Sequence, residues 1–149
     1  MGLIGTIRVS ASALMAQRLR MDVVANNVAN MNSTRAADGS GGPYRRQSVV
    51  FREQRAGGSF RDVFGRAAGS SASSGVEVSS IHLDTTAPRK VHDPTHPDAD
   101  AEGYVLMPNI DVVTEMTDLV GANRAYEASV TVLNATKSMA QSALQIGRR

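Results

Sequence analysis

The chain has 149 residues, enough for one domain with a hydrophobic core, and it contains neither cysteine nor tryptophan. The lack of cysteine excludes disulfides and thiolate metal sites, and no apolar run reaches the roughly 18 residues of a membrane-spanning helix. The net charge of +2 is unevenly distributed. Residues 1–66 hold ten basic and four acidic residues, whereas residues 67–149 hold six basic and ten acidic ones. Halves of opposite charge favour contacts within one chain or between copies.

Residues 6–30 are predicted to form one helix, because the segment is rich in alanine, leucine, methionine and valine and contains neither glycine nor proline. Four apolar residues recur at a spacing of seven, which is typical of a helix that packs against another helix: Ile7, Leu14, Met21 and Val28. Further apolar residues lie outside this stripe, so several faces of the helix are expected to be buried. The four residues are therefore candidate subunit-packing positions.

Four asparagines, Asn26, Asn27, Asn30 and Asn32, crowd the end of this helix, although asparagine is a poor helix former. The first three share one side of the last turns, since Asn30 lies four residues from Asn26 and three from Asn27. A fraying helix end would explain them, because asparagine caps carbonyls and adopts left-handed geometry. The sharper hypothesis is a junction, in which the amides bond to backbone where the helix ends and the chain enters a β-rich insertion.

Residues 32–108 are interpreted as a small β-rich insertion with loose connections, because all five prolines and most glycines of the chain fall here. Three short strands are predicted, at 47–52, 74–83 and 103–107. In the second strand the apolar alternation changes phase between Val78 and Ile81, which predicts a bulge or a break. The small and polar stretch 65–75 is expected to be a mobile loop.

Residues 111–146 give the clearest helical pattern of the chain, with Asp111 as a candidate cap at the start and Gly147 at the end. Ten positions follow alternating four- and three-residue steps, and eight of them are apolar: Val112, Met116, Leu119, Asn123, Tyr126, Val130, Leu133, Lys137, Ala140 and Leu144. A pattern held over more than four heptads favours a coiled coil over an ordinary surface helix. Asn123 and Lys137 interrupt the seam, and polar residues at such positions commonly fix the register.

The two predicted helices differ in length, at roughly 38 Å and roughly 54 Å from the rise per residue. Antiparallel pairing within one chain would leave roughly 16 Å of the last helix without a partner. This mismatch, together with the several apolar faces of the first helix, predicts that helices of other subunits complete the packing. The expected fold is mainly α with a small β-rich insertion. Residues 1–31 and 109–149 form a discontinuous helical core, whose long helices pair as a coiled coil, and residues 32–108 form the insertion.

The segment 91–103 raises the question of a metal site, because it gathers two histidines and four carboxylates: His92, Asp93, His96, Asp98, Asp100 and Glu102. The carboxylates from Asp98 onwards match the first half of a calcium-binding loop, but the twelfth position is Asn109 instead of glutamate. Two prolines also preclude the helix that would enter such a loop. The segment is therefore interpreted as a solvated acidic turn, and no metal is expected.

The stretch PYRRQ, at 43–47, lies just before the first predicted strand. One interpretation is a strand edge with solvated charges. The other is a polar contact between subunits, in which this stretch meets the acidic turn of a neighbour. The candidate contact residues are Tyr44, Arg45 and Arg46 on one side and Asp98, Asp100 and Glu102 on the other. Both interpretations stay open.

No arrangement of residues points to catalysis. None of the serines sits in a G-x-S-x-G turn, and the glycine-rich stretch 39–42 is not followed by a phosphate-binding lysine. We therefore expect neither catalytic residues nor a cofactor. A nucleic-acid-binding or other coiled-coil interaction protein is the alternative. The arginine-rich first half favours nucleic acid, whereas the scarcity of aromatic residues for base stacking weakens it.

The segment SALMAQRLRMDVVANNVANMNSTR, at 12–35, resembles the N-terminal signature of the bacterial flagellar axial proteins, the family of the rod, hook and hook-associated proteins. Three further segments are similar to rod proteins of that family: PYRRQ, HDPTHPDADAEGYVLMPNIDVVTEM at 92–116 and NRAYEASVTVLNATKSMAQSALQIG at 123–147. Together the segments cover over half of the chain. Ala13 stands where the family often has glycine, and Met31 where a small residue is usual.

The resemblance implies a structural subunit without enzymatic activity, exported unprocessed by the flagellar type III apparatus. The start of the chain fits, since it does not read as a cleavable signal peptide. Such proteins polymerise into a helical tube in the cell envelope, whose terminal helices surround the export channel and which transmits torque. The implied partners are other copies of the chain, the rod proteins FliE, FlgB, FlgF and FlgG, and the export apparatus. Neither nucleic acid nor a membrane span is expected, and the implied location is the periplasmic rod of the basal body.

Overall fold

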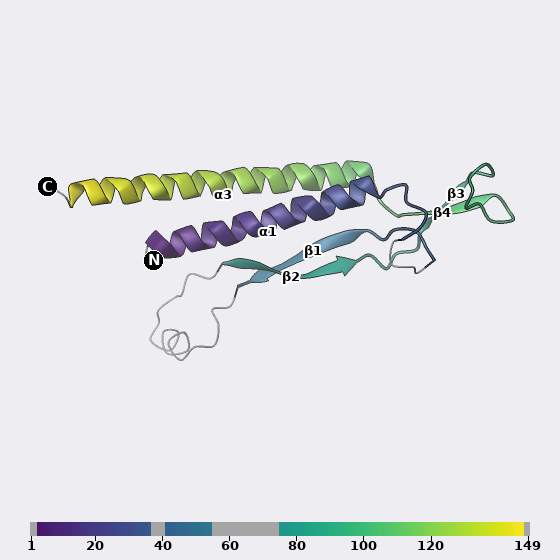
Figure 1. The fold of residues 1–149 in the computed structure, drawn as a ribbon, viewed down its shortest axis with the longest axis horizontal. Helices are drawn as coiled ribbons and strands as arrows, with labels where there is room; N and C mark the ends of the chain where they lie inside the picture. Colours follow the sequence, from purple (N-terminus) through teal and green to yellow (C-terminus); the bar gives the residue numbers. More distant parts are fainter. Residues whose placement is uncertain (1–2, 37–40, 55–74, 148–149) are drawn as a thin grey trace, which may run out of the picture. The chain divides into compact units, whose positions relative to one another are not determined.

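The computed structural model of the chain describes residues 3–36, 41–54 and 75–147. Two long helices at the ends of the chain and two short hairpins between them confirm the predicted class, mainly α with a small β-rich insertion (Figure 1). The elements are, in chain order, α1 (Leu3–Ala29), β1 (Gln47–Glu53), β2 (Val76–Leu83), β3 (Arg89–His92), β4 (Tyr104–Met107) and α3 (Val112–Ile146). No helix in these ranges is both long and apolar enough to cross a membrane. The predicted mobile loop, 65–75, lies outside the described residues apart from Gly75.

Helix α3 begins where the sequence predicts, because Asp111 caps its first turn. The Asp111 carboxylate accepts hydrogen bonds from the Val113 and Thr114 N–H groups, at 3.3 Å each, and from the Thr114 hydroxyl at 2.6 Å. These donors lower the pKa of Asp111, and the Thr114 hydroxyl contributes most. At the other end, the Gly147 N–H donates to the Ala143 carbonyl at 3.2 Å, one residue beyond the helix. The predicted start and end residues therefore bound α3.

The two hairpins are separate two-stranded sheets, β1–β2 and β3–β4. Strands β3 and β4 are antiparallel, with Arg89 opposite Met107 and His92 opposite Tyr104. Strand β3 is missing from the sequence-based prediction, because its four residues, RKVH, include one β-branched side chain and three polar ones. Pairing with β4 therefore decides its conformation.

The predicted irregularity of the second strand is one extra residue. At one end of the β1–β2 hairpin the Gln54 N–H donates to the Gly75 carbonyl at 2.7 Å. At the other end the Asp84 N–H donates to the Arg46 carbonyl at 2.8 Å. Arg46 and Gln54 are eight residues apart on the β1 side, whereas Gly75 and Asp84 are nine residues apart on the β2 side. The additional residue indicates a bulge instead of a break, since β2 runs without interruption over its eight residues.

By their internal contacts the residues form two compact units, and each combines parts of both helices with part of the insertion. The described residues of unit 1 are 3–19, 50–54, 75–80 and 122–147, and those of unit 2 are 20–36, 41–49 and 81–121. Unit 2 buries large side chains, among them Val23, Val24 and Val105. Unit 1 buries small ones, namely Ser10, Ala16, Ala122 and Thr136. The predicted division into helical core and insertion stays a prediction.

Along α3, six predicted seam positions are partly buried: Val112, Leu119, Tyr126, Val130, Leu133 and Ala140. Four other positions of α3 are turned away from solvent, and each lies one residue before a predicted seam position: Glu115, Ala122, Ser129 and Thr136. The Ser129 and Thr136 hydroxyls donate to carbonyls of their own helix, at 2.9 Å and 2.8 Å, so their burial leaves no donor unpaired. Four other predicted positions are exposed: Met116, Asn123, Lys137 and Leu144.

Gly75 lies buried directly before β2, where the hairpin meets α1 within unit 1. The Ser12 hydroxyl donates to the Val9 carbonyl at 2.7 Å and accepts a hydrogen bond from the Val76 N–H at 3.0 Å. A Cβ at position 75 would lie 2.4 Å from the Ser12 Oγ and 2.8 Å from the Gln54 Oε1. Both distances are shorter than real Cβ contacts, so the close approach of hairpin and helix requires glycine.

We expect Gly75→Ala to lower the free energy of unfolding by about 1–3 kcal/mol, because the added methyl group displaces Ser12 from the Val76 N–H. Gly121→Ala is the control. Gly121 lies exposed within α3, no atom comes within 4 Å of a Cβ built there, and alanine is the better helix former by about 0.5–1 kcal/mol. Urea unfolding followed by circular dichroism should show opposite signs for the two variants. A stabilising Gly75→Ala would contradict the close contact.

Candidate functional site: a polar clasp at the helix junction

Asn27, in the last turn of α1, is completely buried and makes four hydrogen bonds. Its side-chain nitrogen donates to the Gln47 carbonyl at 2.8 Å and to the Glu115 Oε2 at 3.0 Å. Its side-chain oxygen accepts from the Gln47 N–H at 2.9 Å and from the Tyr44 hydroxyl at 3.1 Å. The amide therefore pairs with both backbone groups of Gln47, as a neighbouring strand would. It fixes the first residue of β1 against the end of α1.

Glu115, in the first turn of α3, is the other completely buried polar residue of this cluster. Its Oε1 accepts a hydrogen bond from the Arg46 Nε at 2.5 Å, and its Oε2 accepts from the Asn27 amide. Both carboxylate oxygens are thus paired, as a buried charge requires. The first turn of a helix also favours a negative charge, because the N-terminal end of the helix dipole is positive.

Alternating charges continue from Glu115 towards the surface. The Arg46 Nη2 lies 3.5 Å from the Asp118 Oδ2, and the Asp118 Oδ1 lies 3.1 Å from the Arg20 Nη2. The Arg20 and Asp118 side chains are 37% and 36% exposed, so water screens this outer pair more than the inner one. We call these residues the junction clasp: Arg20, Asn27, Tyr44, Arg46, Gln47, Glu115 and Asp118. All of them belong to unit 2.

Tyr44 is held in its neutral form within the clasp. Burial raises the pKa of the Tyr44 hydroxyl, and the charge of Glu115 acts in the same direction. The hydroxyl therefore keeps its proton and donates it to the Asn27 oxygen. The clasp thus joins α1, the segment before β1 and α3 through side chains whose donors match the acceptors that face them.

The other signature asparagines lie outside the clasp. The Asn30 N–H and the Asn30 side-chain amide both donate to the Asn26 carbonyl, at 3.1 Å and 2.9 Å. The Ser33 hydroxyl donates to the Asn30 side-chain oxygen at 3.0 Å. Asn30 thus pairs the Asn26 carbonyl in the last turn of α1 with two donors. The side chains of Asn26 and Asn32 are exposed.

Of the predicted polar contact residues, Tyr44 and Arg46 are engaged within the chain, whereas Arg45 between them is exposed. Asp98 is also engaged within the chain. Its carboxylate accepts hydrogen bonds from the Thr34 hydroxyl at 2.7 Å and from the Arg35 Nε at 2.9 Å. These donors lower the pKa of Asp98, the Thr34 hydroxyl most strongly, and they tie the segment after α1 to the acidic turn.

Other side chains of the acidic turn accept hydrogen bonds from the backbone of the same turn. The Asp100 Oδ1 accepts from the Glu102 and Tyr104 N–H groups, at 2.9 Å and 2.8 Å. The His96 Nδ1 accepts from the Asp98 N–H at 3.0 Å. Within the described ranges, no group of three or more His, Asp or Glu side chains is arranged to hold a metal ion. Asp100 and Glu102 are exposed, and their predicted contact with a neighbouring subunit stays a prediction.

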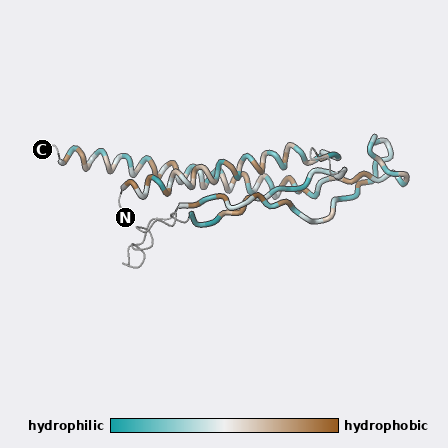
Figure 2. Tube along the Cα trace, turned by 60° about the horizontal axis from the view of Figure 1, so that its bottom comes forward, coloured by the Kyte–Doolittle hydropathy of each residue, from teal (hydrophilic) through white to brown (hydrophobic). Residues whose placement is uncertain are grey.

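Large apolar side chains remain exposed on both helices, and apolar segments recur along each of them (Figure 2). On α1, Ile4 and Met15 are 80% and 75% exposed. On α3, Leu144 and Ile146 are 71% and 78% exposed. The predicted packing residues that are partly buried are Leu14, Met21, Val28, Val112, Leu119, Tyr126, Val130 and Leu133, whereas Ile7, Met116, Asn123 and Leu144 are exposed. Exposed apolar residues in such numbers indicate contacts with further protein.

Two family models match the N-terminal and C-terminal parts of this sequence. The family model "Flagella basal body rod protein" matches residues 7–36, and "Flagellar basal body rod FlgEFG protein C-terminal" matches residues 101–146. The chain is 50% identical to the flagellar basal-body rod protein FlgC of Bacillus subtilis, over 96% of this chain and 97% of the relative. It is 43% identical to FlgC of Borreliella burgdorferi, over 98% of each chain. For FlgC of Salmonella typhimurium the identity is 41%, over 99% of this chain and the whole relative.

Proposed function

The chain belongs to the FlgC family of flagellar basal-body rod proteins, and from this premise we propose that its two long helices build the wall of the rod. It is a structural subunit of the rod, located in the flagellar basal body, and it assembles with other rod proteins. The alternative of a nucleic-acid-binding coiled coil has no support from the matching families.

The observation that carries the proposal is the exposure of apolar side chains along α1 and α3. Met116, Leu144 and Ile146 are 56%, 71% and 78% exposed, although each lies on a helix that already buries another face. Helices of neighbouring subunits would remove these side chains from water, at about 25 cal/mol per Å² of apolar surface. Contacts between unlike patches, repeated with a rotation that does not close, generate a helical tube. Close packing of many such helices makes the tube stiff.

In this proposal the neighbours are other copies of the chain and the rod proteins FliE, FlgB, FlgF and FlgG. The subunit passes through the flagellar export apparatus without a cleaved signal peptide and takes its place in the periplasmic part of the rod. The tube transmits torque and encloses the export channel. Support comes from the family resemblance of the segments 12–35 and 123–147, and the proposal includes no catalytic role.

We propose that the junction clasp holds the helices and the insertion together under load. Asn27 and Glu115 stand at the facing ends of α1 and α3, and both bond to the segment that leads into β1. A force on that segment is therefore passed to both helices through paired polar groups. The hydrogen bond between Asn27 and Glu115 is buried, so water does not compete for it.

Leu133→Asp tests the packing of the helices. Leu133 is partly buried on α3, and a carboxylate at this position would lose hydration in the assembled wall. We expect cells that carry this variant as their sole copy to lose rods and swimming. Asn134→Asp is the matched control, because Asn134 is the next residue on the same helix and is exposed. Normal swimming with Leu133→Asp would contradict the proposed wall.

A further inference from the structure

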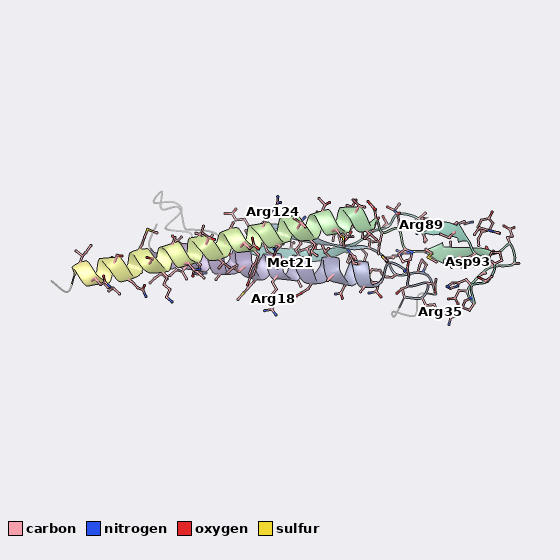
Figure 3. All side chains as sticks on the ribbon, turned by 90° about the horizontal axis from the view of Figure 1, so that it is seen from above. Arg18, Met21, Arg35, Arg89, Asp93 and Arg124 are labelled. Atoms are coloured by element: carbon pink, nitrogen blue, oxygen red, sulfur yellow. The ribbon has the colours of Figure 1, made fainter. Side chains whose placement is uncertain are left out.

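The β3–β4 hairpin and its root carry opposite charges at opposite ends. At the root of the hairpin, Arg45 and Arg89 are exposed. Arg45 lines a small hollow together with Pro88 and Pro108, and Arg89 is the residue that follows Pro88. At the tip, Asp100 and Glu102 are exposed. Figure 3 shows Arg89 near the start of the hairpin and Asp93 towards its far end.

These charges have no ion-pair partner in the part of the chain that the structure describes. Arg45, Arg89 and Glu102 make no salt bridge there, whereas Asp98 is already neutralised by Arg35. The Asp100 Oδ1 accepts hydrogen bonds from two backbone N–H groups, and Asp100 makes no salt bridge in the described residues. Three residue steps of paired strand, roughly 10 Å, separate Arg89 at the root from His92 next to the tip, and this distance exceeds the Debye length of about 8 Å at physiological salt. Tip and root therefore do not neutralise each other within one chain.

One face of the hairpin adds an apolar surface to these charges. The register places Leu106 opposite Lys90 and Tyr104 opposite His92, so the four side chains share a face. Tyr104 and Leu106 are 40% and 45% exposed, while Val105 on the other face is buried. An exposed tyrosine beside an exposed aliphatic residue, with charges around them, is typical of a protein interface.

We propose that the hairpin is a head-to-tail contact between copies of this chain, in which the acidic tip of one copy meets the basic root of the next. This inference rests on the proposed function, because it needs a regular array of subunits. A second copy fits the surface because it presents the complementary charge at the required place, and the contact joins unlike patches. The same contact repeated along an array pairs each tip with a root.

Cysteine cross-linking tests the contact directly, because the chain has no cysteine of its own. Cells would carry Arg89→Cys together with Glu102→Cys as the sole copy, and isolated basal bodies would be oxidised. We expect a ladder of dimers and higher multiples of the chain, and none from either single variant. Arg124→Cys with Glu102→Cys is the control, because Arg124 is exposed on α3 and lies outside the hairpin and its root. Intact rods without a ladder would overturn the contact and leave the rod function standing.

Charge reversal gives a second readout. We expect Arg89→Glu and Glu102→Arg each to reduce the spread of swimming cells in soft agar at least two-fold, and the two together to restore it. Equal loss in the single and double variants would show a folding defect and overturn the contact. Capture of Glu102→Cys by a different rod protein would overturn the assignment of the partner. Failure of the unaltered chain to restore rods in cells that lack it would count against the rod function instead.

Discussion

Replacing Arg46 by methionine is expected to lower the free energy of unfolding by about 3–5 kcal/mol. The Arg46 guanidinium bonds to the Glu115 carboxylate, which is completely buried. Methionine fills a similar volume but leaves that carboxylate with the Asn27 amide as its remaining donor. The loss exceeds that of a surface ion pair, since an unpaired buried charge keeps its full desolvation cost. Guanidinium unfolding followed by far-ultraviolet circular dichroism measures it.

Two companion variants separate the buried ion pair from other effects of the Arg46 substitution. Arg45→Met removes the neighbouring charge, which is exposed and makes no ion pair in the described part of the chain, so we expect a change below about 0.5 kcal/mol. Glu115→Gln in the Arg46→Met background removes the uncompensated charge and should recover part of the loss. Equal effects of Arg46→Met and Arg45→Met would show that the clasp contributes no stability.

Asn27→Leu is the second large effect that we expect, at about 3 kcal/mol or more. Leucine is close in size but removes four hydrogen bonds at a completely buried position. The N–H and C=O of Gln47 and the Tyr44 hydroxyl, which are partly buried, and the buried Glu115 Oε2 then each lose a partner. Each buried unsatisfied group costs about 1–3 kcal/mol. Thermal unfolding and the soft-agar spread of cells that carry the variant should both show the loss.

Arg35→Ala and Asn26→Leu are the controls for this prediction. Arg35 pairs with Asp98 but is 80% exposed, and surface ion pairs contribute about 0–1 kcal/mol. Asn26 lies next to Asn27 on the same helix, and its side chain is exposed. We therefore expect both controls to swim. Equal tolerance of Asn27→Leu and Arg35→Ala would return the asparagine cluster to the simple interpretation of a fraying helix end.

Local signals made the helix ends and most strands predictable from the sequence. Asp111 caps α3 as its position before an apolar run indicates, and the predicted irregularity of the second strand agrees with the extra residue on the β2 side of the hairpin. The hypothesis of amides bonded to backbone describes Asn27, whose partner is Gln47. Asparagine is informative here because an exposed helix would seldom keep so many poor helix formers.

The partners of Asn27 could not be predicted, because they are distant in sequence. Glu115 lies 88 residues from Asn27 and 69 from Arg46. In the sequence it resembles any acidic residue in the first turn of a helix, where the helix dipole explains it without a partner. Arg46 likewise resembles a solvated charge before a strand. Their pairing follows from tertiary contacts that no periodicity encodes.

Half of the buried or partly buried positions of α3 were not predicted by the sequence pattern, for a related reason. The prediction follows apolar residues, whereas Glu115, Ser129 and Thr136 are polar and still turned inward. Each finds a partner, in the clasp or on a carbonyl of its own helix. Two apolar residues that the pattern selected, Met116 and Leu144, are exposed, and we propose that they pack against other subunits. A hydrophobic pattern therefore mixes internal and external packing in a subunit of an assembly.

The most direct test of the proposed role is a side-chain-resolved electron cryo-microscopy map of basal bodies that contain this chain. We predict that α1 and α3 stand in the wall of the rod, with Met116 and Leu144 buried against helices of neighbouring subunits. We also predict that Asn27, Arg46 and Glu115 remain paired in the assembled subunit. A map in which the two helices lie outside the wall, with Met116 and Leu144 facing water, would contradict the account.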